Sequence, residues 1–137
     1  MIAYCDTSSL IKLYADEPGS EAVRKLLSEA GQITTSSVAY VEMRAALARL
    51  RRERRMTATV FARVKQEFDA DWEATIVVRA DADIVRAAAD LAERHHLRAI
   101  DAIHLASFVE ILERRTDDDV YFSSFDERLN RAARRLK

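Results

Sequence analysis

The sequence has few of the residues that build disulfide-rich, loop-rich or fibrous proteins. Its 137 residues include one cysteine, one proline and two glycines. A single cysteine excludes an internal disulfide framework and is typical of a reducing compartment. So few glycines and prolines leave little material for long flexible linkers. We therefore expect a single domain over residues 1–137, located in the cytoplasm.

Long apolar runs and an excess of one charge are also lacking. No apolar run is long enough to span a bilayer, and the N-terminus lacks the basic start and apolar core of a signal peptide. The formal net charge is −1, so overall charge selects neither nucleic acid nor a membrane as a partner. There is no glycine-rich phosphate loop, which excludes the nucleotide-binding classes that depend on one. Local clusters of side chains must therefore indicate the function.

Strand-like and helix-like apolar patterns alternate along the chain. The patterns predict strands at residues 1–5, 32–35, 74–78 and 120–123, and helices beginning near residues 7, 21, 38, 57, 81, 99 and 126. Ser20 and Ser36 or Ser37 are expected helix caps, and residues 117–119 a polar turn. Strands that alternate with helices predict a parallel sheet covered on both faces.

The first predicted strand ends in an acid followed by three hydroxyl residues. Residues 2–5 are apolar, Asp6 follows, and helical spacing resumes with Leu10 and Leu13. In open parallel sheets, ligands bind at the carboxyl ends of the strands. The sequence therefore places Asp6 where chemistry is usually carried out.

Three further acids occupy comparable places. Glu42 is expected on the inner half of the third helix, beside Val38, Val41 and Ala45, and Asp126 follows the last strand. Asp101 begins a helix that is apolar on nearly every face, which is the pattern of a buried helix.

Each acid also has a purely structural explanation. Asp6 and Asp126 could be helix N-caps, which contribute about 1 kcal/mol each. Asp101 could complement the dipole of its helix N-terminus. Glu42 could pair with an arginine one helical turn away. These alternatives remain open for each acid taken singly.

Asp101 is the hardest of the four to explain structurally. An isolated carboxylate in apolar surroundings costs several kcal/mol, and several carboxylates together repel one another. A divalent cation removes both difficulties, and Mg²⁺ or Mn²⁺ prefers such oxygen ligands. Zinc is not indicated, because His95 and His96 are adjacent and His104 is alone, which favours ordinary core or surface histidines.

Four short motifs together resemble those of the PIN-domain family. They are DTSSL at residues 6–10, SSVAYVE at 36–42, DAIHLA at 101–106 and SFD at 124–126. Their order and spacing, and the chain length, are similar to the VapC-type toxins of bacterial and archaeal toxin–antitoxin pairs. The resemblance implies a three-layer α/β/α PIN-like fold with a central, mostly parallel sheet. It also implies an Mg²⁺- or Mn²⁺-dependent endoribonuclease that is a homodimer, acts on RNA and is inhibited by a cognate antitoxin.

The resemblance carries site residues over by position. The acids fall on Asp6, Glu42, Asp101 and Asp126, and the supporting hydroxyls on Thr7 and Ser124, where threonine is more usual. The fourth acid is the most variable in the family, and Asp119, at the other end of the last strand, is a poorer candidate for that role.

The expected chemistry is metal-assisted hydrolysis of a phosphodiester, with one ion or two about 4 Å apart. Asp6 and Asp101 are the expected primary ligands, Glu42 would hold metal-bound water, and Asp126 would hold a second ion or an outer water. The hydroxyls of Thr7 and Ser124 would orient carboxylates. The resemblance implies products with a 5′-phosphate and a 3′-hydroxyl.

A cluster of arginines on the third helix offers possible phosphate contacts. The cluster extends from Arg44 to Arg55, and its candidate RNA contacts are Arg44, Arg49, Arg51 and Arg52. The same cluster is also typical of a solvated helix end, and the family resemblance adds contact with an antitoxin tail as a third possibility.

Two other enzyme classes place acids at strand ends but need different residues. A phosphoacceptor signalling domain needs adjacent acids after its first strand and an aspartate closing a middle one. Here Cys5 precedes Asp6, and Val78 leads to Arg79. A phosphatase with an aspartyl nucleophile needs Asp-x-Asp, and Ser8 occupies the second position. The remaining alternative is a non-catalytic PIN-like module that binds RNA or a protein.

Overall fold

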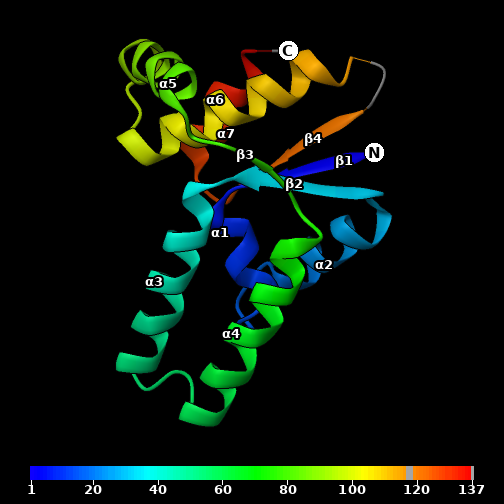
Figure 1. Ribbon diagram of the computed structural model, residues 1–137, viewed down its shortest axis with the longest axis vertical. Coiled ribbons are helices and arrows are strands. Elements are labelled where there is room, and N and C mark those ends of the chain that lie inside the picture. The colour runs from blue at the N-terminus through cyan, green and yellow to red at the C-terminus, as the bar shows by residue number, and fades with distance from the viewer. Residues whose placement is uncertain (117–118, 137) are drawn as a thin grey trace.

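A parallel sheet lies between two layers of helices in the computed structural model, which describes residues 1–116 and 119–136 (Figure 1). The strands are β1 (Ile2–Cys5), β2 (Gln32–Ser36), β3 (Ile76–Val78) and β4 (Val120–Ser123). The helices are α1 (Thr7–Leu10), the 3-10 turn η1 (Ile11–Leu13), α2 (Ser20–Glu29), α3 (Val38–Arg52), α4 (Ala58–Glu73), α5 (Ala82–His95), α6 (Ala99–Arg114) and α7 (Glu127–Arg134). The predicted α/β fold with a parallel sheet is confirmed.

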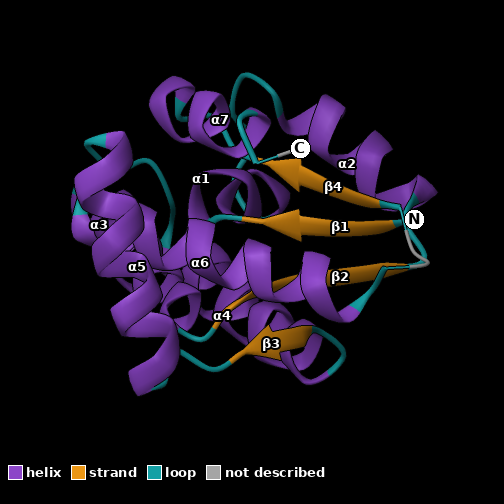
Figure 2. Cartoon of the chain, turned by 90° about the horizontal axis from the view of Figure 1, so that it is seen from above, coloured by secondary structure: helices purple, strands orange, loops and turns teal. Residues whose placement is uncertain are grey.

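The strands lie in the order β3-β2-β1-β4, and each neighbouring pair is parallel (Figure 2). In the register of β1 with β4, Cys5 is opposite Ser123. All four carboxyl ends therefore meet at one edge of the sheet. Asp119 lies at the opposite edge, where its carbonyl accepts a hydrogen bond from the backbone N–H of Ile2. The rest of the turn predicted at residues 117–119 lies outside the described residues.

Strand β1 is buried on both of its faces. Ile2 and Tyr4 belong to the core formed with α5, α6 and α7, while Ala3 and Cys5 belong to the core beneath α1, α3 and α4. Successive side chains of a strand point to opposite faces, so a strand covered by helices on both sides must be apolar throughout. This burial explains the unbroken apolar run before Asp6.

Helix α6 is the central helix of one layer, as its apolar composition predicted. Phe108 is fully buried, with its ring centroid 5.8 Å from that of Tyr4 and 4.8 Å from that of Phe122. Although α6 is apolar, no helix in the part of the chain that the structure describes is long and apolar enough to cross a membrane.

The predicted inner face of α3 was wrong. Val41 is 65% exposed, whereas the helix buries Ala39, Met43, Leu47 and Leu50. These residues recur at spacings of four and three and pack against α1, η1 and α4. The predicted stripe with Val38, Val41 and Ala45 is apolar as well. Only the position of the neighbouring elements therefore decided which stripe of α3 is buried.

Ser20 is not the cap of α2. The N-cap is Gly19, whose φ of 98° is accessible to glycine, and a Cβ there would lie 2.6 Å from the ring of Phe125. The Ser20 hydroxyl instead accepts from the backbone N–H of Glu17 and donates to the carbonyl of Ala15. At α3, Ser37 is the N-cap residue, but its hydroxyl accepts from the backbone N–H of Ala80 instead of capping the helix.

The packing of α6 predicts a large loss of stability for Phe108→Ala. Removing this ring leaves a cavity between α6 and the sheet, which we expect to cost about 3–5 kcal/mol of unfolding free energy. Chemical denaturation would measure it. Val85→Ala, at a side chain of α5 that is 49% exposed, is the control and should change stability by less than about 0.5 kcal/mol. Equal losses in the two variants would contradict the assigned core.

Candidate active site

Asp6 lies at the carboxyl end of β1 and serves as the N-cap of α1. Its Oδ1 accepts from the Ser8 hydroxyl at 2.7 Å and from the backbone N–H of Ser9 at 3.1 Å. Its Oδ2 accepts from the hydroxyl of Ser124, just past β4, at 2.5 Å. The parallel register of β1 and β4 brings Ser124 alongside Asp6. Two segments 118 residues apart thus hold one carboxylate.

Asp6 is the most buried of the four acids, with 4% of its surface exposed. Burial raises the pKa of Asp6 above its ordinary value of 3.8, and the hydrogen bonds from Ser124 and Ser8 offset only part of this effect. Among the described residues, no lysine or arginine forms an ion pair with Asp6. The site therefore contains a buried carboxylate whose charge lacks a close counterion from those side chains.

Glu42 comes from the second turn of α3 and is held by two donors. The Thr7 hydroxyl donates to its Oε1 at 2.7 Å, and His104 Nε2 lies 2.8 Å from the same oxygen. Burial alone would raise the pKa of Glu42, but the hydrogen bonds from His104 and Thr7 outweigh it and hold the pKa below its ordinary value of 4.5. Glu42 is therefore kept ionised.

His104 links the interior of the sheet to Glu42. It is 1% exposed, and its Nδ1 lies 2.9 Å from the hydroxyl of Tyr4 on β1. With the ring proton on Nε2, His104 donates to Glu42 and accepts from Tyr4, so both ring nitrogens are satisfied. Sequence reasoning treated His104 as an ordinary core or surface histidine. The available signal was its position three residues after Asp101, on the same face of α6.

Asp101 and Asp126 form a second pair of acids, bridged by an arginine. Arg98 Nε lies 3.2 Å from Asp101 Oδ2, and Arg98 Nη2 lies 3.5 Å from Asp126 Oδ2. The expectation that Asp101 is the buried, unpaired acid was wrong. Its side chain is 22% exposed and ion-paired, because the first turn of α6 reaches the open edge of the molecule. Asp6 holds that position instead.

Ser124 connects Asp6 to Asp126. Its hydroxyl donates to Asp6, and its oxygen accepts from the backbone N–H of Asp126 at 3.0 Å. Asp126 also caps α7 by accepting from the backbone N–H of Leu129 at 2.9 Å. The predicted hydroxyls therefore both contact predicted acids: Thr7 contacts Glu42, and Ser124 contacts Asp6.

Hydrogen bonds and ion pairs connect Asp6, Asp126 and Asp101, but the acids do not form a preassembled metal site. Within residues 1–116 and 119–136, no three histidine, cysteine or acidic side chains lie close enough together to hold an ion. A polar cavity of about 520 Å³ lies at this edge, and its lining includes Arg98, Asp101 and Asp126. The donor chemistry nevertheless fits Mg²⁺ or Mn²⁺, which bind carboxylates and keep several waters. Asp6, buried without an ion pair of its own, is the residue that such an ion would neutralise.

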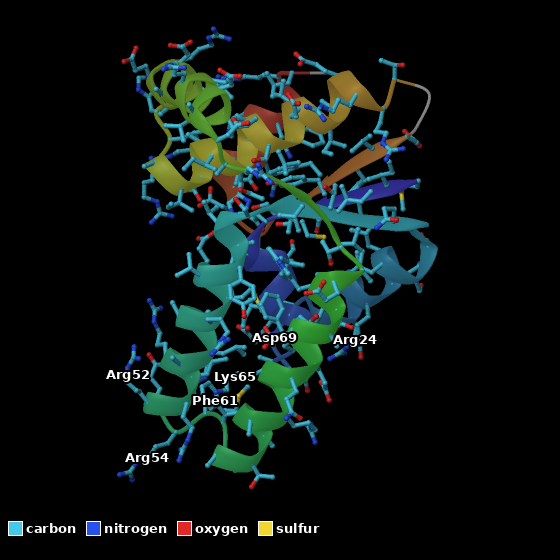
Figure 3. All side chains as sticks on the ribbon, viewed as in Figure 1. Arg24, Arg52, Arg54, Phe61, Lys65 and Asp69 are labelled. Atoms are coloured by element: carbon cyan, nitrogen blue, oxygen red, sulfur yellow. The ribbon has the colours of Figure 1, made fainter. Side chains whose placement is uncertain are left out.

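The arginines predicted as phosphate contacts lie along α3. Arg44, two residues after Glu42, donates a hydrogen bond to the Tyr40 hydroxyl at 3.2 Å. The other three occupy the last turn, and Arg52 points outward at the end of α3 that is far from the sheet (Figure 3). A rise of 1.5 Å per residue places Arg52 about 15 Å from Glu42 along the helix. Of these four arginines, only Arg44 lies within one helical turn of Glu42.

A parallel sheet with four acids along its carboxyl edge defines an α/β protein whose site lies at the strand ends. The chain belongs to the PIN-domain family, because residues 3–135 match the PIN domain. The family expected from the four motifs is thereby confirmed.

Two curated relatives match nearly the whole chain. They are Ribonuclease VapC45 of Mycobacterium tuberculosis strain CDC 1551 / Oshkosh and Ribonuclease VapC49 of strain ATCC 25618 / H37Rv. Each is 33% identical over 132 residues, which cover 96% of this chain and 89% of the relative.

Solved structures share the fold at lower identity. The VapC20 toxin of Mycobacterium tuberculosis, described as cleaving the sarcin–ricin loop, superposes with a TM-score of 0.66 and 18% identity, over 95% of this chain and 94% of its own. VapBC2 from Rickettsia felis, bound to a DNA fragment from its promoter, gives a TM-score of 0.57 and 14% identity, over 92% of this chain and 100% of its own. Both support the three-layer PIN-like architecture.

The raised pKa of Asp6 predicts that Asp6→Asn stabilises the metal-free protein. Because the unfolded chain ionises Asp6 at a lower pH than the folded one, stability falls as the pH rises from 3.8 through the higher folded pKa. Above the folded pKa of Asp6, the folded protein carries the full free-energy cost of burying the ionised carboxylate. The neutral amide of asparagine avoids that cost. Without divalent ions at pH 7, Tm should rise, since roughly 1 kcal/mol corresponds to about 3–5 °C in a domain of this size. Asp90→Asn, at an exposed residue of α5, is the control; a lower Tm for Asp6→Asn would contradict the prediction.

Glu42→Gln is expected to have the opposite effect. The depressed pKa of Glu42 means that its carboxylate stabilises the fold above pH 4.5, and that this contribution is lost as the pH falls through the folded pKa. The variant should therefore melt a few degrees below the wild type at pH 7, with the gap closing under acid conditions. Thermal melts across pH would measure this, with Glu113→Gln on the exposed face of α6 as control. A gap that does not change with pH would reject the assignment.

Proposed function

We propose that this protein is a metal-dependent endoribonuclease of the VapC type, acting as the toxin of a toxin–antitoxin pair in the cytoplasm. The observation that carries the proposal is the 33% identity, over 96% of the chain, to relatives that are named ribonucleases. The acids at the carboxyl edge supply the chemistry that such an activity needs. The proposed partners are an RNA substrate, a cognate antitoxin and a second copy of the chain.

Asp6 and Asp101 are the proposed primary ligands of Mg²⁺ or Mn²⁺, with Glu42 and Asp126 beside them. When bound, the ion supplies charge that holds the scissile phosphate, lowers the pKa of the attacking water and stabilises the leaving oxygen. Ser8 and Ser124 orient the two oxygens of Asp6, and Thr7 with His104 keeps Glu42 ionised and in place.

Arg98 has a separate part in this proposal. Its single positive charge lies against both Asp101 and Asp126 and offsets part of their mutual repulsion in the ion-free chain. The Arg98 side chain is 79% exposed, so it can leave the acids without disturbing the core. Arg98 therefore offers a positive group at the cavity for a substrate phosphate once the acids have another partner.

Metal binding and RNA cleavage are the decisive measurements. An ion that binds only the folded protein must raise its Tm, so wild-type Tm should rise with Mn²⁺ or Mg²⁺. Asp6→Asn should abolish that rise and lower RNA cleavage by about two orders of magnitude, comparable to the loss of one preorganised electrostatic contact. Asp90→Asn should retain both.

The outcomes separate the alternatives. Folded wild type that neither gains stability from the ions nor cuts RNA would be a non-catalytic PIN-like binding module. A rise in Tm without cleavage of any cellular RNA would support the metal site and reject the nuclease. Undiminished cleavage by folded Asp6→Asn protein would remove Asp6 from the mechanism.

A further inference from the structure

A second polar cavity adjoins the one that contains Asp101 and Asp126. Its volume is about 360 Å³, and it is lined by His95, His96, Arg128, Arg131, Ala132 and Arg135. Arg128 and Arg131 also line the cavity that contains Asp101 and Asp126, so the two cavities meet along these side chains. The lining of the second cavity includes three arginines and two histidines but no acid. A basic groove therefore leads directly away from the proposed cleavage site.

The arginines of the groove form one stripe on α7 and its C-cap. Arg128, Arg131 and Arg135 are spaced by three and four residues, so they share one face of the helix. With 1.5 Å of rise per residue, the stripe is about 10 Å long, enough to contact more than one phosphate of a strand. Arg131 and Arg135 are exposed and have no acidic partner among the described residues. Arg134, by contrast, faces away from the groove and pairs with Glu127.

The other wall of the groove includes His95, whose unsatisfied donor is buried beneath the surface. Within the described chain, both ring nitrogens of His95 are buried without a hydrogen-bond partner. An imidazole always carries at least one N–H, so a donor at this wall lacks an acceptor. Burial lowers the pKa of His95, and Arg94, Arg135 and His96 lower it further, as expected where positive groups converge. A bound anion would offset the repulsion among the positive groups of this groove.

We propose that this groove, between the C-terminal end of α5 and α7, binds the sugar–phosphate backbone of the RNA substrate next to the cleavage site. The inference rests on the proposed nuclease function and deepens it by assigning the surface that holds the substrate. Since the chain has a net charge of −1 and an acidic site, a polyanion needs a local cationic surface to approach. The groove supplies that surface beside Asp101 and Asp126, whereas Arg52 lies at the end of α3 that is remote from the sheet (Figure 3).

The test compares three variants that each lose two positive charges. Arg131→Gln with Arg135→Gln alters the groove, and Arg49→Gln with Arg52→Gln alters the far end of α3. Arg24→Gln with Lys25→Gln alters exposed positions of α2, on the other face of the sheet, as the matched control. Binding of a short 5′-labelled oligoribonucleotide is followed by fluorescence anisotropy at several salt concentrations, with EDTA present to prevent cleavage. Circular dichroism and Tm establish that each variant is folded.

The groove variant should flatten the slope of log affinity against log salt. Each lost phosphate contact lowers that slope by about 0.7 for single-stranded RNA, so two lost contacts lower it by about 1.4. The α2 variant should keep the wild-type slope. A groove slope equal to that of the α2 variant would overturn the proposal, as would a decrease confined to the α3 variant.

Two further readouts separate this proposal from its alternatives. If the groove variant keeps the RNA slope but binds a labelled oligoglutamate peptide less tightly than wild type, the groove binds an acidic protein segment and the RNA assignment is overturned. Cleavage of RNA by the wild type with Mn²⁺ is measured in parallel. Cleavage with an unchanged groove slope rejects the groove alone, whereas absence of cleavage rejects the nuclease function itself.

Discussion

The burial of Asp6 at the end of β1 is the constraint on which the rest of the site depends. A parallel strand covered by helices on both sides delivers the residue that follows it into a desolvated environment, and here that residue is an acid. Ser8, Ser9 and Ser124 donate hydrogen bonds to this carboxylate, which orient it without neutralising its charge. Burying the ionised Asp6 carboxylate thus lowers the free energy of unfolding, and a bound cation would offset this loss.

The four acids are accommodated in different ways. Glu42 is stabilised as a carboxylate by His104 and Thr7, and Asp101 and Asp126 share Arg98. Asp6 accepts three hydrogen bonds but has no lysine or arginine partner among the described residues, and its pKa stays raised. The site therefore combines one buried carboxylate that lacks a cationic partner with three carboxylates that have nearby donors or cations. This combination suits a centre that binds a divalent ion. The basic groove on α7 adds the opposite charge beside it, so acidic chemistry and a polyanionic substrate can meet at one edge.

Much of the architecture was predictable from local patterns. The apolar run before Asp6, the helix starts expected near residues 57, 81 and 126 and the apolar helix from Ala99 all gave correct elements. These signals are local, because capping and periodicity act within one or two turns. The inner face of α3 was not predictable in the same way, since its two apolar stripes are distinguished only by what packs against them.

The sequence by itself determined the order of strands and helices, the family motifs and the identity of the acids placed near strand ends. Only the tertiary structure decided which acid is desolvated, that Arg98 bridges Asp101 and Asp126, and that His104 joins Tyr4 to Glu42. It also brought the end of α5 beside α7 to form the basic groove. The physical reason is that burial and electrostatic partners depend on distances between segments far apart along the chain, and no local pattern encodes those distances.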